Sequence, residues 1–228
     1  MYEPTFRRKR NGVHVLSKLE IDYMGEGFVH DFQPEVLEKP GPVDIERFVE
    51  FYLGMTIDYQ YLSHKGIYLG MTVFSDTDFV PVFSPETNHA EYISAKANTC
   101  FIDMQLLDEK QEGRYRFTLG HEGSHCILHT DYYARRREHT QLSAVTCRTG
   151  MEKKQNDPKR WSDLETMEWQ ANRLSAAILM PFRAVNTVVR DNRGGGKKKL
   201  IASVSKTFRV SREAAGYRLQ ELGYIKGK

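Results

Sequence analysis

The segment His121-Glu122-Gly123-Ser124-His125 combines residue types and spacing that suit metal-dependent hydrolysis. Residues four apart lie on one face of a helix, so the two imidazoles can bind one metal ion. Glu122 can reach a water molecule at that ion and take its proton as the water attacks a carbonyl. This HExxH motif therefore predicts peptide-bond hydrolysis, with Glu122 as general base. The alternative is that both histidines are ordinary core residues with satisfied hydrogen bonds.

A catalytic zinc ion needs a third protein ligand beside the two histidines. Glu168 is the best-placed candidate, because it lies on a second long predicted helix that can pack beside the first. Asn172 follows one turn later and is predicted to hydrogen-bond the outer ring nitrogen of a ligand histidine. The other downstream candidates are His129, His139 and Glu165. Of these, His129 has a poor reach, since it lies one further turn along the HExxH helix.

Two helices are expected to position these residues, the first spanning residues 114–129. Its motif-bearing face is formed by Phe117, His121, His125 and Leu128. The second helix starts at the N-cap Ser162, with Glu165 as its capping-box partner, and ends before Pro181. Its expected inner face consists of Leu164, Met167, Ala171, Leu174 and Ile178. Residues 130–160 between the helices are predicted to form a long polar loop.

Short β-rich runs upstream of the motif predict a small sheet. They are residues 66–74, 79–83 and 98–103, separated by polar turns. A helix is predicted before them, from Asp44 to about Gly54. We therefore expect an α+β fold, in which a small antiparallel or mixed sheet packs on the HExxH helix and on the second ligand-bearing helix.

The C-terminal segment differs in charge from the rest of the chain. Residues 193–228 contain ten basic and two acidic residues, a net charge of +8, whereas the remainder has a net charge of −5. Residues 200–225 have the spacing of a helix-turn-helix. Arg212, Tyr217 and Arg218 are the expected contacts with nucleic acid or a protein partner. The alternatives are DNA contact, docking of a protein substrate, or packing on the body with a solvated basic face.

The composition is that of a globular protein, with 228 residues of which 40% are hydrophobic and 28% charged. No apolar run approaches the roughly 20 residues of a membrane span, and no secretory signal is recognisable. Three cysteines without CxxC spacing fit a reducing compartment, so we expect a cytoplasmic protein. The expected domains are an unassigned N-terminal extension, a zinc metallopeptidase-like domain and a basic helix-turn-helix-like C-terminal subdomain, at residues 1–41, 42–192 and 197–228.

Two stretches carry a family resemblance. YRFTLGHEGSHCILH and EWQANRLSAAILMP, at residues 115–129 and 168–181, closely resemble the ImmA/IrrE family of zinc metallo-endopeptidases. Residues 42–54 look like the helix that precedes the sheet in that family, so the similarity covers roughly residues 42–225. Two departures are Ser124, where the family usually has glycine, and Ile178, where it often has leucine; neither removes a reactive group.

The resemblance implies that His121, His125 and Glu168 bind zinc and that Glu122 is the general base. It also implies regulatory proteolysis, since members of the family cleave helix-turn-helix transcriptional repressors. In such gluzincin-like proteases an extended substrate adds to an edge strand of the sheet. The expected edge strand is formed by Asn98, Thr99, Cys100, Phe101 and Ile102, with an ordinary core strand as the alternative.

Stabilisation of the oxyanion needs a hydrogen-bond donor besides the metal. The candidates are His129, Tyr132, Tyr133 and His139. Two functions remain open at this point. The first is a zinc endopeptidase acting on a repressor-like protein, and the second is a metal-dependent DNA-binding regulator without proteolytic activity. Three protein ligands with an open position favour the first, whereas a closed shell of four protein ligands favours the second.

Overall fold

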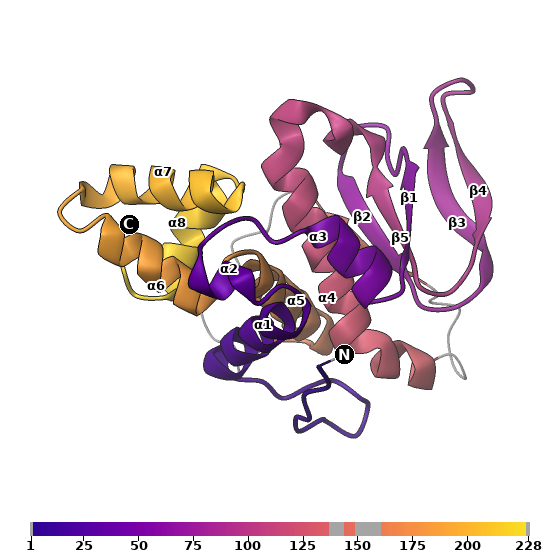
Figure 1. Ribbon diagram of the computed structural model, residues 1–228. Helices are drawn as coiled ribbons and strands as arrows, with labels where there is room; N and C mark the ends of the chain where they lie inside the picture. The colour runs from indigo at the N-terminus through magenta and orange to yellow at the C-terminus, as the bar shows by residue number, and fades with distance from the viewer. Residues whose placement is uncertain (1, 137–143, 149–160, 227–228) are drawn as a thin grey trace.

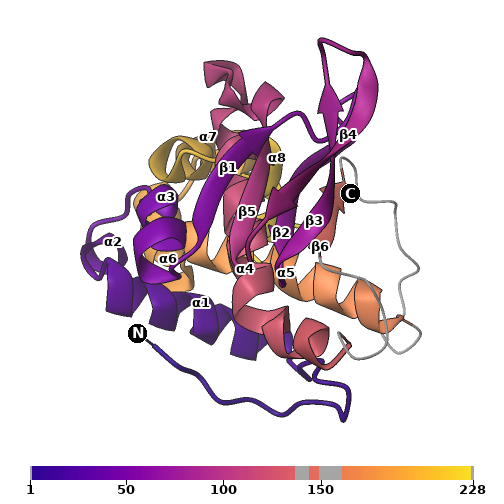
Figure 2. The ribbon, with the colours of Figure 1, turned by 90° about the vertical axis from the view of Figure 1, so that its right-hand side faces the viewer.

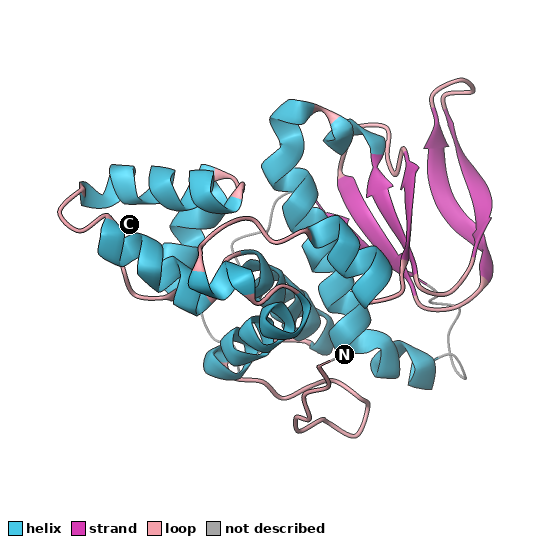
Figure 3. Ribbon diagram, viewed as in Figure 1, coloured by secondary structure: helices cyan, strands magenta, loops and turns pink. Residues whose placement is uncertain are grey.

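Helix α4 (Glu112–Arg136) runs through the middle of the molecule and separates the strands from most of the other helices (Figure 1). The structure, a computed structural model, describes residues 2–136, 144–148 and 161–226. Helices gather on one side and strands on the other (Figure 3), which confirms the expected α+β fold. Among the described residues, no helix is both long enough and apolar enough to span a bilayer.

The main sheet is mixed and lies against α4, which is seen behind it in Figure 2. Strands β1 and β5 are parallel, whereas β2 is antiparallel to both β5 and β6. The order is β1-β5-β2-β6, formed by Thr56–Gln60, Thr99–Asp103, Tyr68–Val73 and Ala144–Arg148. The sequence runs at 66–74 and 98–103 predicted β2 and β5, whereas β1 and β6 were not foreseen.

The prediction of an edge strand at Asn98, Thr99, Cys100, Phe101 and Ile102 is wrong. Strand β5 lies between β1 and β2 and bonds to both, so it has no free edge for a substrate. All five residues of β5 are buried. The alternative of an ordinary core strand was right, because a short continuous apolar run is typical of a strand covered on both faces.

A separate hairpin stands at the margin of the sheet (Figure 1). It consists of β3 (Thr77–Ser84) and β4 (His89–Ala95), which pair antiparallel. The run at 79–83 predicted β3. Strand β4 was not foreseen, because most of its residues are exposed and only Ile93 and Ala95 are partly buried.

Helix α5 (Asp163–Leu179) begins and ends as the sequence predicts. The Ser162 hydroxyl accepts a hydrogen bond from the Glu165 backbone nitrogen at 3.2 Å, and the Glu165 carboxylate accepts one from the Ser162 nitrogen at 2.9 Å. These bonds form the capping box. The inner face was predicted correctly except for Leu164, which is 51% exposed in the first turn, before the helix reaches the core.

Helix α4 continues past residue 129, where the sequence predicted a loop. Tyr132 and Tyr133 lie in its last turns and are buried, together with Phe74 and Met167. The Tyr133 ring stacks on Phe74, with ring centroids 4.3 Å apart. The burial of two aromatic side chains stabilises these extra turns, which local polarity alone did not indicate.

Residues 2–40 belong to the body of the protein. Helix α1 (Lys18–Phe32) packs on α5, and its Met24 and Phe28 are part of the main core. A Cβ atom on Gly25 would lie 2.5 Å from the Ala177 Cβ, so the two helices approach too closely for a larger residue. A short helix, α2 (Glu35–Glu38), follows, and then α3 (Ile45–Arg47), which continues as a π-helix, η1 (Phe48–Tyr52).

Three helices close the chain: α6 (Phe182–Asp191), α7 (Gly196–Phe208) and α8 (Arg212–Glu221). Between α7 and α8, Arg209 has a left-handed conformation with φ 52°, and the Ser211 hydroxyl caps α8. This is the predicted helix-turn-helix spacing. Its apolar residues Val204, Phe208 and Leu219 are buried in the same core as α1 and α5, so the described contacts show a tail packed on the body.

The prediction that Arg218 contacts nucleic acid or a partner is wrong. Its side chain is 0% exposed; Nη1 lies 2.6 Å from Asp22 Oδ1, and Nε donates to the Met180 carbonyl at 3.1 Å. The residue that neutralises it stands 196 positions earlier in the chain, so the helical spacing alone could not indicate burial. Arg212 and Tyr217 are exposed, and their contacts stay predictions.

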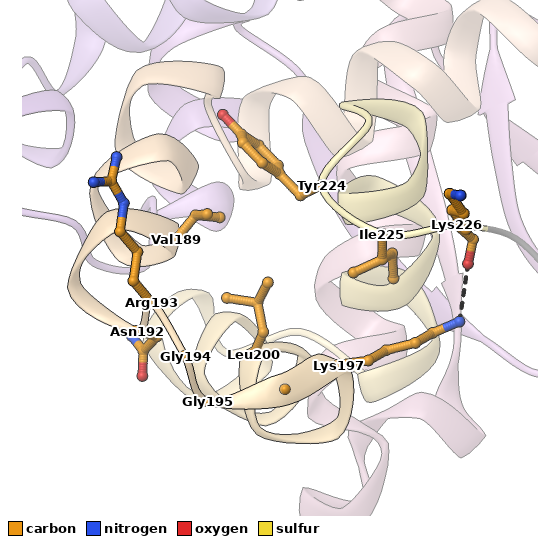
Figure 4. Close-up of a pocket in the computed structure, with 11 residues that line it drawn as sticks. Val189, Asn192, Arg193, Gly194, Gly195, Lys197, Leu200, Tyr224, Ile225 and Lys226 are labelled. Atoms are coloured by element: carbon orange, nitrogen blue, oxygen red, sulfur yellow. Dashed lines mark hydrogen bonds between the residues drawn. The ribbon is translucent and has the colours of Figure 1, made fainter.

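A shallow hollow between α6, α7 and the C-terminal residues carries part of the basic surface of the tail (Figure 4). Arg193, Lys197 and Lys226 line it, together with Leu200 and Tyr224, and none of its lining residues is acidic. Lys197 Nζ donates to the Lys226 carbonyl at 3.0 Å.

Candidate metal centre

His121, His125 and Glu168 meet where α4 crosses α5. The Nε2 atoms of the two histidines are 2.9 Å apart. The Glu168 carboxylate lies 3.5 Å from His121 Nε2 through Oε2 and 3.3 Å from His125 Nε2 through Oε1. The histidine side chains are 1% exposed and that of Glu168 is 33% exposed. The structure thus brings together the three predicted ligands, with the carboxylate as the member that reaches the surface.

The three donors have the separations that one small divalent cation requires. Zinc bonds of about 2.0–2.2 Å at tetrahedral angles hold two donors about 3.3 Å apart. The observed distances of 2.9, 3.3 and 3.5 Å scatter around that value. In the part of the chain that the structure describes, the group contains two imidazoles and one carboxylate and no further His, Cys, Asp or Glu. This donor set fits a metal ion.

The His121 imidazole is held in the form that binds a metal. Burial, followed by the neighbouring His125, lowers the pKa of His121 to about 3, although the nearby Glu168 opposes the shift. A ring with such a pKa is neutral at physiological pH and keeps a lone pair on one nitrogen. Unprotonated imidazole nitrogen is a good zinc donor.

Asn172 lies close to the ligands on both helices. Its side-chain nitrogen donates to the Glu168 carbonyl at 2.7 Å, and its side chain also interacts with His121, where it favours the protonated ring. However, His121 Nδ1 has no partner with regular hydrogen-bond geometry among the described residues. The predicted bond from Asn172 to a ligand histidine therefore stays a prediction.

Glu122 points from α4 to the sheet and is fully buried. The Thr72 hydroxyl on β2 lies 2.6 Å from Glu122 Oε2 and donates to it. The second oxygen, Oε1, has no hydrogen-bond partner within the described residues. Burial raises the pKa of Glu122 well above its usual value. A carboxylate with one held oxygen and one unbonded basic oxygen is suited to take up a proton.

Gly70 on β2 is the neighbour that leaves room for Glu122. A Cβ atom at this position would lie 2.6 Å from Glu122 Oε1 and 2.8 Å from the Thr118 Cγ2. Both distances are too short for real contacts, so the space exists only because residue 70 has no side chain. Neither Gly70 nor Thr72 could be identified from the sequence, where both are ordinary residues of an apolar run.

We expect Gly70→Ala to lower the cleavage rate at least tenfold while zinc affinity changes little. The added methyl group must displace the Glu122 carboxylate, and misplacement of a reacting group by an ångström is costly, but it touches none of the three ligands. Single-turnover cleavage and zinc titration measure the two effects. The control is Gly216→Ala in α8, where the nearest atom to a new Cβ is 3.7 Å away. Equal activity of the two variants would contradict the placement of Glu122.

The predicted donors to the oxyanion have different outcomes. The prediction of His129 as a donor is wrong, because the residue is fully buried and both of its ring nitrogens already have partners. Nδ1 lies 2.9 Å from His125 Nδ1, and Nε2 lies 3.2 Å from Gln170 Oε1. Tyr132 and Tyr133 are buried in α4, and their role stays a prediction. His139 lies outside the described residues.

We expect Glu168→Gln to reduce zinc affinity by more than 100-fold. Loss of a partner that merely supports a ligand typically reduces affinity 10- to 100-fold, and loss of a ligand's charge has a larger effect. The matched control is Glu165→Gln on the same helix, which affects the capping box but not the metal site. Competition with a chelator measures both. If Glu165→Gln has the larger effect, the assignment of the third ligand is wrong.

An HExxH helix packed on a mixed sheet, with a carboxylate supplied by the next long helix, defines the class of HExxH metallopeptidases. The chain belongs to the family described as the IrrE N-terminal-like domain, a metallopeptidase family, whose model matches residues 103–220. This confirms the family resemblance seen in the sequence. The match includes α7 and ends at residue 220 in the last turn of α8, but it begins only at the end of β5, so it is shorter than the expected range of about 42–225. A comparison with curated proteins found no match.

Proposed function

We propose that the protein is a zinc-dependent endopeptidase of the cytoplasm that cleaves a peptide bond in a regulatory protein, namely a helix-turn-helix transcriptional repressor. The observation that carries the proposal is the Oε1 of the buried Glu122, which accepts no hydrogen bond from the described residues and lies next to the group of His121, His125 and Glu168. Ligands alone would suit a structural metal. A buried carboxylate beside them is the group that a proton transfer needs.

A zinc ion held by the three ligands would polarise a peptide carbonyl and favour deprotonation of water. The side chains of the protein perform the remaining steps. Glu122 Oε1 accepts a proton from the attacking water and later donates it to the nitrogen of the leaving amine. Thr72 holds Oε2 at 2.6 Å and thereby orients the carboxylate during both transfers. Because Glu168 is the exposed member of the site, the substrate approaches from its side.

The substrate is expected to bind in extended form along β6 rather than β5. Strands β1 and β6 are the two ends of the order of the described strands, but only β6 pairs with β2, where Thr72 is opposite Val145. The outer backbone groups of an end strand can pair with an added chain. A peptide added there would lie one strand away from β2, which holds Glu122 through Thr72.

The alternative, a metal-dependent DNA-binding regulator without proteolytic activity, has weaker support. A closed shell of four protein ligands would favour it, whereas the group among the described residues contains three. In addition, Arg218, one of the three residues expected to contact nucleic acid, is buried in the core and paired with Asp22.

Co-expression with the repressors encoded beside its gene tests the proposal, followed by mass spectrometry of the fragments. We expect one repressor to be cut at a defined bond, and only when zinc is present. Intact repressors throughout, together with sequence-specific retention of DNA by the zinc-loaded chain, would support the alternative instead.

A further inference from the structure

A row of buried polar groups continues from His125 away from the metal site. His125 Nδ1 lies 2.9 Å from His129 Nδ1, and His129 Nε2 lies 3.2 Å from Gln170 Oε1. Gln170 Nε2 in turn donates to the backbone carbonyl of His14 at 2.8 Å. The three residues behind the site, His14, His129 and Gln170, are from 0% to 4% exposed, so water does not compete for these bonds.

With neutral imidazole rings, the row can be occupied by protons in only one way. The His14 carbonyl only accepts, so Gln170 must present its NH₂ group there and its oxygen to His129. The oxygen also only accepts, so the His129 proton is on Nε2. A charged His129 would be an unpaired buried cation, which is costly; the ring is therefore neutral and its Nδ1 accepts. His125 must then carry a proton on Nδ1, so in the neutral ring that binds a metal the lone pair is on Nε2.

The His125 nitrogen with the lone pair is the one that faces His121 and Glu168. We infer that Gln170 and His129 are positioning residues. The His14 carbonyl orients the Gln170 amide, the amide oxygen fixes the tautomer of His129, and His129 in turn fixes His125 as the tautomer that binds metal. The inference rests on the metal site of the proposed function but not on cleavage. It assigns a role to His14 and its neighbours, which lie outside residues 103–220, the part that matches the family.

The N-terminal segment is tied down where this role requires it. Lys9 Nζ and Asn11 Nδ2 each lie 2.6 Å from the Asp163 carboxylate at the start of α5. The backbone nitrogen of Lys9 donates to the Val13 carbonyl at 2.7 Å and so closes the turn before His14. These contacts fix the segment that carries the His14 carbonyl against α5, the helix that bears both Gln170 and Glu168.

The direct test is ¹⁵N NMR of the histidine rings in the metal-free, full-length chain. We expect His125 protonated on Nδ1 and His129 protonated on Nε2. The reverse tautomer at either ring would overturn the inference, whatever the protein does to peptides. Because the measurement uses neither metal nor substrate, it separates a failure of the inferred role of this row from a failure of the proposed function.

Substitution gives a second readout. Gln170→Leu keeps the approximate size of the side chain but removes both of its bonds, and we expect zinc affinity to fall about 10- to 100-fold. The control is Ser175→Ala, which removes a partly buried hydrogen bond of 3.0 Å from α5 to the Phe117 carbonyl of α4 and involves no imidazole. Zinc affinity of folded Gln170→Leu within twofold of the control would contradict the role of Gln170.

Discussion

Glu122→Gln is expected to reduce peptide-bond cleavage by about 10²- to 10⁴-fold, the usual contribution of a general base, while the fold and the bound metal are kept. The amide has nearly the same shape, and its oxygen can still accept the bond from Thr72, which is 2.6 Å long in the wild type. It has no basic oxygen to take a proton from water. The neutral side chain also avoids the cost of burying a carboxylate, which raises the pKa of Glu122.

The experiment compares the variant with wild type for three properties: cleavage of the co-expressed repressor, zinc content and melting temperature. We expect only the first to fall. Glu109→Gln, which changes an exposed carboxylate just before α4, is the matched control and should cleave normally. Cleavage by Glu122→Gln at more than a tenth of the wild-type rate would show that another group is the base.

Asp22→Asn is expected to destabilise the chain by about 3–5 kcal/mol, the usual cost of breaking a buried ion pair. Asp22 on α1 lies 2.6 Å from Arg173 on α5 and 2.6 Å from Arg218 on α8. The two arginine side chains are 2% and 0% exposed, so neither can turn to water. Their remaining acidic neighbour is Glu221, which lies 3.1 Å from Arg173 and 3.9 Å from Arg218.

Denaturant unfolding measures this effect as a change in the free energy of unfolding. The control is Asp76→Asn, which removes a pair with Lys96 at 2.9 Å on the surface, where the two side chains are 62% and 84% exposed. Exposed pairs contribute about 0–1 kcal/mol, so the control should change little. A loss below 1 kcal/mol for Asp22→Asn would mean that the N-terminal and C-terminal helices are not joined through this charge.

The group of candidate metal ligands could be predicted from the sequence because its chemistry is visible in local spacing. HExxH fixes two histidines on one helical face, and the capping box at Ser162 fixes where the helix of Glu168 begins. The groups that orient the site could not be predicted in the same way. Thr72 and Gly70 come from a strand that the sequence did not connect with Glu122, and His14 contributes a backbone carbonyl, which leaves no pattern.

The burial of His129 and the start of α1 are both marked by local sequence patterns. His129 repeats the spacing of four on the HExxH face, and a buried imidazole there needs a partner, which is Gln170. The N-terminal helix is marked by Ser17 and Glu20, which form a capping box, followed by apolar residues at helical spacing. Strand order, in contrast, leaves no local signal in the sequence. Strand β5 is central because β1 and β2 flank it, and this depends on pairing between distant segments.

The central claim is that two imidazoles and one carboxylate bind a single metal ion and leave a position for solvent. It is tested most directly by a crystal structure of the zinc-loaded chain, with anomalous scattering at the zinc edge. The account predicts one zinc ion within about 2.2 Å of His121 Nε2, His125 Nε2 and a Glu168 oxygen, with solvent as the fourth ligand. A zinc ion bound by a fourth protein side chain, or one that Glu168 does not contact, would contradict it.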